Sequence, residues 1–358
     1  MKAHVVLAAW ALGAAVAHPG NWSDANGSAA GASCPEAVDI AVAADDAVLP
    51  VLRALLASIE LHSPRSFVHV VTTSAALEHC HGVLAGSPVP ARCVEWTEDA
   101  AAAARSQVKV VSGANTPACA GLEGCDGARA QRLANVLNFA RFHLAELLPQ
   151  LDRVIWMDCD VIVRGPLHGV AAAASRHPGA LLSAFSEPQR FGRFYLDEGA
   201  VTRLMETGFP GLRLDTEAES FNDGVISINL QRWREVDATK TFAWLMSQHH
   251  AAEPGLWKYG TQPAMMLLGV AYGWERLEGQ WYHGDLGFRS AHKDDLGGAI
   301  FLHFDGEKKP WKEGGLNKEL WRPYAEHADA PGRAGARDAC ECGRAGQGAA
   351  AVLVRARK

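Results

Sequence analysis

The sequence predicts an α/β fold in which a mainly parallel central sheet carries helices on both faces. Residues 38–96 alternate short apolar runs with segments of helical spacing, and this β-α-β-α-β order is typical of parallel sheets. Residues 153–163 form the most apolar run and are expected to be a central strand. With 48% hydrophobic residues in 358, the chain can bury a sizeable core.

The expected elements follow from apolar spacing and from the prolines that end helices. Strands are expected at 38–44, 67–73, 92–96, 153–163, 225–230 and 299–304. Helices are expected at 49–61, before Pro64, at 77–84, at 131–148, before Pro149, at 233–250 and, as a short helix, at 261–268. Residues 112–128, with Gly, Pro and two Cys, are expected to form a loop.

The first 17 residues resemble a signal peptide. Lys2 precedes the apolar run 5–17, which ends in Ala15-Val16-Ala17, a small-x-small cleavage pattern. A short signal anchor is the alternative, although the run is too short to span a bilayer as a helix. We expect a flexible linker at 18–37, one catalytic domain at 38–328, and a disordered or Cys-containing tail at 329–358.

The predicted linker carries two N-glycosylation sequons, at Asn21 and Asn26. They agree with passage through the secretory pathway, as a Golgi or ER lumenal or a secreted protein without a stable membrane span in the mature chain. The net charge of −6 and the isoelectric point near 6.2 give no indication of a nucleic-acid partner.

Eight cysteines fit an oxidising compartment. We expect pairs between Cys80 and Cys93 and between Cys119 and Cys125. Cys340 and Cys342 pair with each other or with Cys34, and connectivity cannot be deduced from spacing alone. Cys159, inside an apolar strand, is expected to be a small buried thiol. The spacings do not match a zinc site.

Asp158 and Asp160 interrupt the most apolar strand. Burying an unpaired carboxylate costs free energy, and a divalent cation bound at the strand end would remove this cost. The alternative is that an aspartate at the strand end forms an ion pair within the protein. His303 follows the last strand and can be a metal ligand. Gly306 would let the backbone approach a phosphate, and Lys309 would supply positive charge to it.

Two further segments carry polar residues where a buried surface is expected. Asn222 and Asp223 precede Gly224 and an apolar strand, where an ordinary turn is the alternative interpretation. Arg141 lies on a helix of core residues, so that its side chain either enters a cleft or forms a surface salt bridge.

Together these motifs resemble glycosyltransferase family 8, the GT-A-fold group that contains glycogenin, bacterial lipopolysaccharide galactosyl- and glucosyltransferases, and plant galacturonosyltransferases. The resemblance covers about residues 38–324. Some stretches look most like plant galacturonosyltransferase-like and animal glycosyltransferase-8-domain proteins; they are 137–141 with 147–149, 260–263, and 302–303. The resemblance implies a GT-A-type, Rossmann-like domain.

The resemblance also implies a role for each candidate residue. The metal ligands would be Asp158, Asp160 and His303, for Mn²⁺ in most members, with Mg²⁺ as the alternative. The donor-binding residues would be Ala43 and Asp45 for the base, Arg141, Asn222 and Asp223 for the sugar, and Gly306 and Lys309 for the diphosphate. Gln262, Asn222 and Arg141 are the candidates for contact with the reacting sugar.

Two departures leave sugar identity open. Many members carry Asp before the residue equivalent to Gln262, where this chain has Thr261, so Asp223 or Glu187 would have to supply a carboxylate. Some relatives have a ribose-binding Asn where this chain has Ala47.

The expected function is a retaining, Mn²⁺-dependent transfer of a hexosyl or uronosyl group from a UDP-sugar to a glycan or other hydroxyl acceptor. The alternative is a non-catalytic secreted module that binds nucleotide sugars or glycans on the same fold. A self-glucosylating primer similar to glycogenin is a third possibility, which the signal peptide argues against.

The compartment prediction can be tested on protein from the native host. We expect a mature N-terminus near His18 and glycans on Asn21 or Asn26, because a signal peptidase would cleave after Ala17. N-terminal sequencing and glycopeptide mass spectrometry check this. Intact Met1 together with unmodified Asn21 and Asn26 would refute a secretory route.

Overall fold

The computed structural model describes residues 37–330, apart from 88, 108, 110–134 and 259. The predicted signal peptide, sequons and linker, the loop 112–128 and nearly all of the predicted tail lie outside these residues. So do the predicted pairings of Cys119, Cys125, Cys340, Cys342 and Cys34. Among the described helices, none is both long and apolar enough to cross a bilayer.

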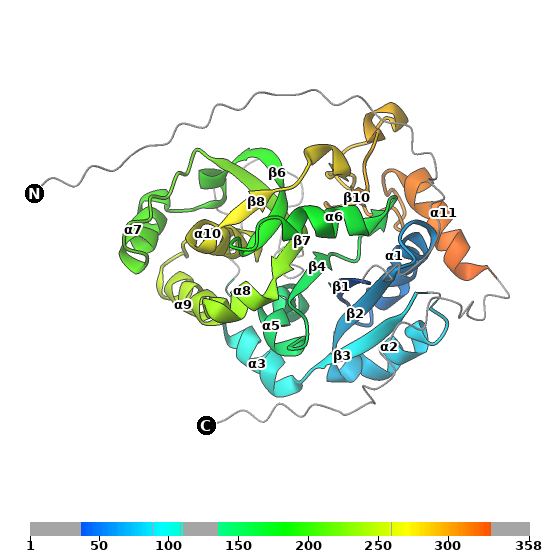
Figure 1. Cartoon of the computed structure of the whole chain (residues 1–358), viewed down its shortest axis with the longest axis horizontal. Coiled ribbons are helices and arrows are strands. Elements are labelled where there is room, and N and C mark those ends of the chain that lie inside the picture. Colours follow the sequence, from blue (N-terminus) through cyan, green and yellow to red (C-terminus); the bar gives the residue numbers. More distant parts are fainter. Residues whose placement is uncertain (1–36, 88, 108, 110–134, 259, 331–358) are drawn as a thin grey trace, which may run out of the picture. The chain divides into compact units, whose positions relative to one another are not determined.

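A seven-stranded sheet forms the centre of the fold, in the order β3-β2-β1-β4-β7-β6-β8. Its strands are β1 (Val38–Ala43), β2 (Ser66–Thr73), β3 (Ala91–Trp96), β4 (Arg153–Met157), β6 (Leu182–Arg190), β7 (Glu219–Asn229) and β8 (Trp274–Arg276). Strands β3, β2, β1 and β4 are parallel, and β7 runs antiparallel to both β4 and β6 (Figure 1). The predicted α/β, mainly parallel sheet is confirmed.

A second, three-stranded sheet lies beside the first, in the order β5-β10-β9. It consists of β5 (Val161–Val163), β10 (Phe301–His303) and β9 (Tyr282–His283). The prediction of one continuous strand over 153–163 is therefore wrong. The chain turns at Asp158-Cys159-Asp160 and passes from the large sheet to the small one, which brings both carboxylates to the junction of the two sheets.

Helices cover both faces of the large sheet, as predicted. One face is covered by α1 (Leu49–His62), α2 (Leu77–Leu84) and α6 (Leu167–Ser175), which pack on Ile40, Val68 and Ile155. The opposite face packs on α8 (Leu230–Glu235), α9 (Ala238–Ala251) and α10 (Gln262–Tyr272) through Trp156 and Ile226. Successive strand residues thus alternate between two apolar cores.

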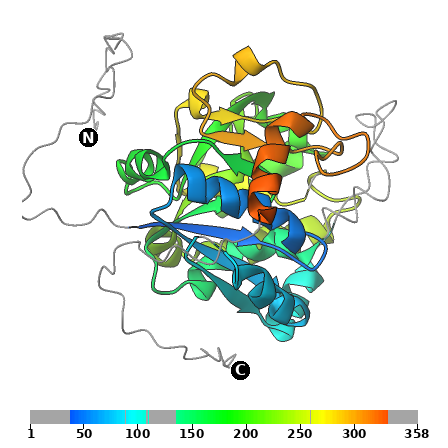
Figure 2. The same ribbon diagram turned by 90° about the vertical axis from the view of Figure 1, so that its right-hand side faces the viewer.

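The remaining helical elements complete these layers. They are the 3₁₀ helices η1 (Ser74–Ala76), η4 (Val136–His143), η5 (Phe191–Phe194), η6 (Gly279–Trp281) and η7 (Lys293–Leu296), and the helices α3 (Glu98–Gln107), α5 (Leu144–Leu147), α7 (Glu198–Gly208) and α11 (Lys318–Asp329). Helix α11 lies beside α1 (Figure 2), where Asp329 forms an ion pair with Arg53.

Three further predicted elements differ from those observed. In place of a helix over 131–148, the described part is η4 followed by α5, with the Asn135 side chain accepting from Leu137 N. The predicted helix 233–250 breaks at Asp237, whose φ of 54° lies in the left-handed region that Asp tolerates. Strand β7 starts at Glu219, well before the predicted residue 225.

Two cysteine predictions are confirmed. Cys80 and Cys93 form a disulfide that ties α2 to β3, and Cys159 is a buried free thiol. The disulfide agrees with an oxidising compartment.

Candidate functional site

Two aspartates and a histidine from separate strands meet at the carboxyl end of β4. Asp158 follows β4, Asp160 precedes β5, and His303 ends β10. His303 Nε2 lies 3.2 Å from Asp160 Oδ1 and 3.9 Å from Asp158 Oδ2. One ligand atom from each residue lies within 4.8 Å of the others. The structure therefore brings together the three residues that the sequence predicted as metal ligands.

The imidazole of His303 is held in place by two neighbours. Its Nδ1 hydrogen-bonds the Tyr282 hydroxyl at 2.7 Å, which leaves Nε2 to face the carboxylates. On its other side, the ring packs on Gly224, where an added Cβ would stand 2.2 Å from His303 Cε1. Gly224 thus makes room for the histidine. No motif indicated Tyr282, because it lies in a short strand far from the aspartates in sequence.

The charges of the three residues depend on one another. Burial raises the pKa of Asp158 and outweighs the nearby Arg141. Burial would also raise the pKa of Asp160, but the charges of Lys309 and His303 lower it well below the usual value. Burial would lower the pKa of His303, yet Asp160 and Asp305 raise it to about 9.

These residues fit a divalent cation. Two carboxylates and an imidazole are ligands that Mn²⁺ accepts, whereas the predominantly oxygen-binding Mg²⁺ has less preference for the imidazole. A histidine binds a metal as the neutral imidazole, so a cation entering here replaces the proton that the carboxylates favour on His303.

Arg141 forms ion pairs with Asp158, which follows β4, and with Asp223 on β7. Its side chain is buried, with Nη2 2.9 Å from Asp158 Oδ1 and Nη1 2.9 Å from Asp223 Oδ2. The guanidinium lies 4.6 Å from the Trp156 ring centroid, and Trp156 Nε1 donates to Asp158 Oδ1 at 3.0 Å. The alternative of a surface salt bridge is therefore wrong. Arg141 is buried, and its charge is balanced by two of the chain's own carboxylates.

Thr261, which precedes Gln262, is hydrogen-bonded to a carboxylate of β7. Thr261 Oγ1 donates to Asp223 Oδ2 at 3.0 Å, and the same oxygen faces Arg141. The carboxylate next to Arg141 thus comes from β7. The turn anticipated around Asn222 is absent, because residues 219–224 belong to the strand.

Two amide side chains lie beside this carboxylate. Gln262, the first residue of α10, donates from Nε2 to the Phe221 carbonyl at 2.8 Å, and its Oε1 can act as an acceptor. Asn222 accepts from Gly224 N at 2.8 Å and donates to Glu187 Oε1 at 2.9 Å. Burial raises the pKa of Glu187 although the Asn222 hydrogen bond opposes it.

Lys309 reaches the metal group from the segment after β10. Its Nζ contacts Asp160 Oδ2 and donates to the Phe304 carbonyl at 2.9 Å. Lys308, one residue earlier, is exposed. Gly306 has a φ of +110°, and an added Cβ would stand 2.6 Å from the Gly287 carbonyl carbon, so the glycine is required by the fold itself.

The predicted base-binding residues lie at the end of β1, next to the strand that leads to the two aspartates. Asp45 Oδ1 accepts from the backbone N–H of Ala47 and Val48, both at 3.1 Å, and Oδ2 accepts from Asn135 Nδ2 at 2.8 Å. The Ala43 carbonyl accepts from the Cys159 thiol at 3.2 Å. Strand β1 neighbours β4 in the sheet, so both positions flank the metal group.

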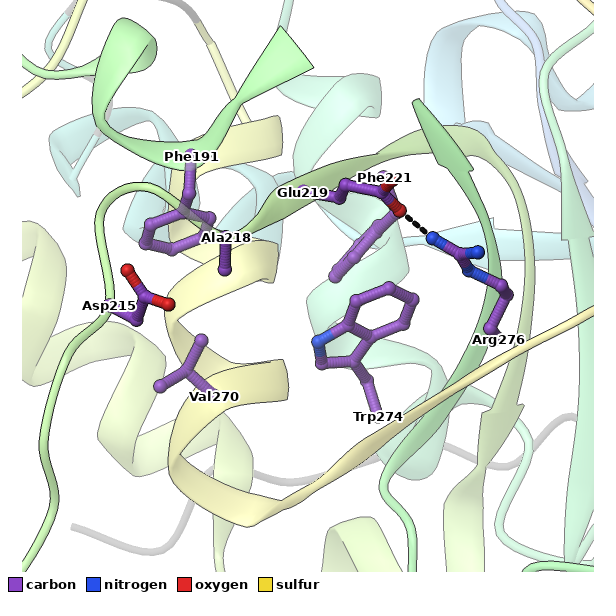
Figure 3. A pocket seen from close by; sticks show the side chains of 8 residues that line it. All are labelled: Phe191, Asp215, Ala218, Glu219, Phe221, Val270, Trp274 and Arg276. Atoms are coloured by element: carbon purple, nitrogen blue, oxygen red, sulfur yellow. Dashed lines mark ion pairs between the residues drawn. The ribbon is translucent and has the colours of Figure 1, made fainter. Parts of the chain in front are cut away.

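A cavity of about 410 Å³ lies beside the outer strands, between α10, β7 and β8 (Figure 3). Phe221 and Trp274 stand against each other in it, and Glu219 pairs with Arg276 at its rim. None of the predicted metal, donor-binding or catalytic residues lines this cavity.

The close contact between Gly224 and His303 can be tested by substitution. Gly224→Ala should displace the imidazole, weaken Mn²⁺ binding at least about 10-fold and cost about 1–3 kcal/mol of stability, because the added methyl overlaps the ring. Titration calorimetry with Mn²⁺ and thermal unfolding measure both. Gly169→Ala in α6, where the methyl meets nothing within 4 Å, is the control. Equal Mn²⁺ affinity in both variants would contradict the assignment.

Comparison with known sequences gives distant relatives. The chain is 24% identical over 213 residues to "Probable galacturonosyltransferase 14" of Arabidopsis thaliana, covering 56% of this chain and 38% of that protein. It is 30% identical over 217 residues to "Probable galacturonosyltransferase-like 9" of Arabidopsis thaliana, covering 54% and 50%. It is 27% identical over 206 residues to "Glycosyltransferase 8 domain-containing protein 2" of Macaca fascicularis, covering 54% and 58%. The chain thus spans about half or less of the length of most of these relatives.

Among solved structures, the fold is similar to that of the galactosyltransferase LgtC in complex with donor and acceptor sugar analogues. The TM-score is 0.54 at 21% identity, covering 81% of this chain and 95% of that one. This likeness confirms the predicted GT-A fold. The family model described as "Glycosyl transferase family 8" matches residues 40–315. The chain therefore belongs to glycosyl transferase family 8.

Proposed function

We propose that this protein is a retaining glycosyltransferase that moves a hexosyl or uronosyl group from a UDP-sugar to a hydroxyl of a glycan or another acceptor. Mn²⁺ is the proposed cofactor, with Mg²⁺ as the alternative. The observation that carries the proposal is the convergence of Asp158, Asp160, His303 and Lys309 from β4, β5, β10 and the segment that follows. Family membership and the GT-A fold support it.

The arrangement suits the departure of a nucleoside diphosphate. A bound divalent cation would supply Lewis-acid stabilisation of the negative charge that develops there. Lys309, whose Nζ lies next to Asp160, would place an ammonium against the same charge. Tyr282 and Gly224 hold the His303 ring, so little reorganisation is required when the diphosphate binds.

The sugar would lie over the amide side chains on the β7 side of the metal group. Gln262 presents Oε1 because its nitrogen is bound to the Phe221 carbonyl. An amide oxygen is a weak nucleophile, but it can stabilise positive charge on an oxocarbenium-like sugar. We therefore favour attack of the acceptor on the same face from which the diphosphate leaves, with a phosphate oxygen taking the acceptor proton.

The nucleoside would lie on the other side of β4, over β1. Asp45 and the Ala43 position stand there, and the Asp45 carboxylate is fixed by the start of α1 and by Asn135. Ligands of open α/β sheets bind beyond the carboxyl ends of the strands, which here are those of β1 and β4. The Cys80–Cys93 disulfide supports a Golgi, ER lumenal or extracellular location.

The competing hypothesis is a secreted module on this fold that binds nucleotide sugars or glycans without catalysis. Retention of the complete group of two carboxylates, imidazole and Lys309 favours the enzyme, because a binding module has no need to stabilise a leaving diphosphate. Binding of UDP-sugars without turnover would instead favour the module.

The enzyme can be tested with a screen of UDP-sugars for donor hydrolysis and transfer. We expect turnover of at least one UDP-sugar with Mn²⁺, and its loss in excess EDTA. Asp160→Ala should abolish that turnover while the protein stays folded, because a ligand and the partner of Lys309 are removed. Turnover that continues unchanged in EDTA would refute the metal assignment.

Lys309 and Lys308 form a matched pair for testing the diphosphate contact. Lys309→Ala should lower turnover on the order of 10²-fold, because a contact to growing charge strengthens in the transition state. Lys308→Ala removes the same charge one residue away, from an exposed position, and should cost little. Steady-state kinetics and donor affinity of both variants decide. Equal effects at the two positions would rule out this role for Lys309.

A further inference from the structure

We propose that the donor-sugar site selects a neutral sugar and rejects a uronic acid, with Glu187 and Asp223 as the residues that enforce the choice. This inference rests on the proposed function and narrows its substrate class. The named plant relatives are described as galacturonosyltransferases, so it also sets this chain apart from them.

The position of the sugar follows from the order of the strands. Asp158 and Asp160 stand at the end of β4, with β1 on one side and β7 on the other. Asp45 and the start of α1 occupy the β1 side. The polar side chains beyond the metal group on the other side come from β7, β6 and the first residue of α10, and it is there that a sugar attached to the diphosphate would find hydrogen-bond partners.

The β7 side of the metal group carries more negative than positive charge. Arg141 is the cation, and both of its ion pairs are with the chain's own carboxylates, Asp158 and Asp223, at 2.9 Å. Asp223 is only 7% exposed, and its carboxylate also accepts a hydrogen bond from Thr261 Oγ1. The guanidinium therefore has no unmatched charge to offer to a ligand carboxylate.

Glu187 adds a third carboxylate, from β6. In the part of the chain that the structure describes, its hydrogen bond goes to the neutral amide of Asn222, and no ion pair with a cation is seen. Asn222, only 8% exposed, is fixed by Gly224 on its other side and presents no charge of its own. Glu187 and Asp223 thus bring two carboxylates to this side, of which Asp223 pairs with Arg141.

A neutral hexose and the matching uronic acid differ only at C6, as CH₂OH or COO⁻. The hydroxymethyl group can donate to Glu187 or Asp223, whereas a carboxylate cannot donate and is repelled. One like charge at about 6 Å, at an effective dielectric constant of about 20, changes binding on the order of 10²-fold. A discrimination of that size is therefore expected between the two donors.

The test compares matched donors. UDP-galactose against UDP-galacturonic acid, and UDP-glucose against UDP-glucuronic acid, are assayed for kcat/KM with Mn²⁺ and for binding by calorimetry. We expect the preferred neutral donor to exceed its uronic acid counterpart on the order of 10²-fold. Equal or greater activity with the uronic acid overturns the inference and leaves the proposed function standing. Turnover of no UDP-sugar overturns the proposed function itself, and the inference with it.

Glu187→Gln identifies the residue responsible. Glutamine keeps an acceptor oxygen for Asn222 but removes the charge, so the preference should fall at least about 10-fold, through a gain for the uronic acid donor. Glu235→Gln is the control, because Glu235 is an exposed carboxylate on α8 that pairs with Arg232. An unchanged preference in Glu187→Gln, or an equal shift in Glu235→Gln, refutes the role of Glu187.

Discussion

The partly buried carboxylates of Asp158 and Asp160 are the constraint on which the rest of the site depends. Two negative charges at the end of an apolar strand are costly unless they are neutralised. The chain supplies Arg141 to Asp158, and Lys309 and His303 to Asp160. These partners come from η4, β10 and the segment after it. The two carboxylates in the turn between β4 and β5 are therefore neutralised only when most of the domain is folded around them.

The topology explains how such distant residues meet. The chain leaves the large sheet at Asp158 and enters the small one at Val161, and the antiparallel pairing of β5 with β10 brings His303 opposite. On the other side, β7 runs antiparallel to β4 and carries Asn222, Asp223 and Gly224 past its end. The three candidate metal ligands, Lys309 and the polar side chains of β7 thus share one edge, which is where ligands of α/β sheets bind.

Much of this could be predicted from the sequence, and the remainder shows the limits of local patterns. Asp158 and Asp160 were recognisable because charges that interrupt an apolar strand need an explanation. His303 was recognisable because it follows the last strand in a motif, with Gly306 and Lys309, that resembles the family. The break of the strand at these same aspartates was not, because apolar residues on both sides fit one strand as well as two. Hydrophobic periodicity gives no information on side-chain contacts between distant segments. It therefore could not predict the roles of Tyr282 and Trp156 or the hydrogen bond between Thr261 and Asp223. The left-handed backbone conformation of Asp237 likewise could not be predicted, because the apolar spacing around it is that of a continuous helix.

We expect a divalent cation to bind between Asp158, Asp160 and His303. The most direct measurement is anomalous diffraction at the manganese edge from crystals grown with Mn²⁺ and UDP. Binding at this place should give one strong peak bounded by a carboxylate oxygen of each aspartate and by His303 Nε2, and the peak should be lost in crystals of Asp160→Ala. A peak bound elsewhere, or clear UDP density with no anomalous signal beside these residues, would contradict it.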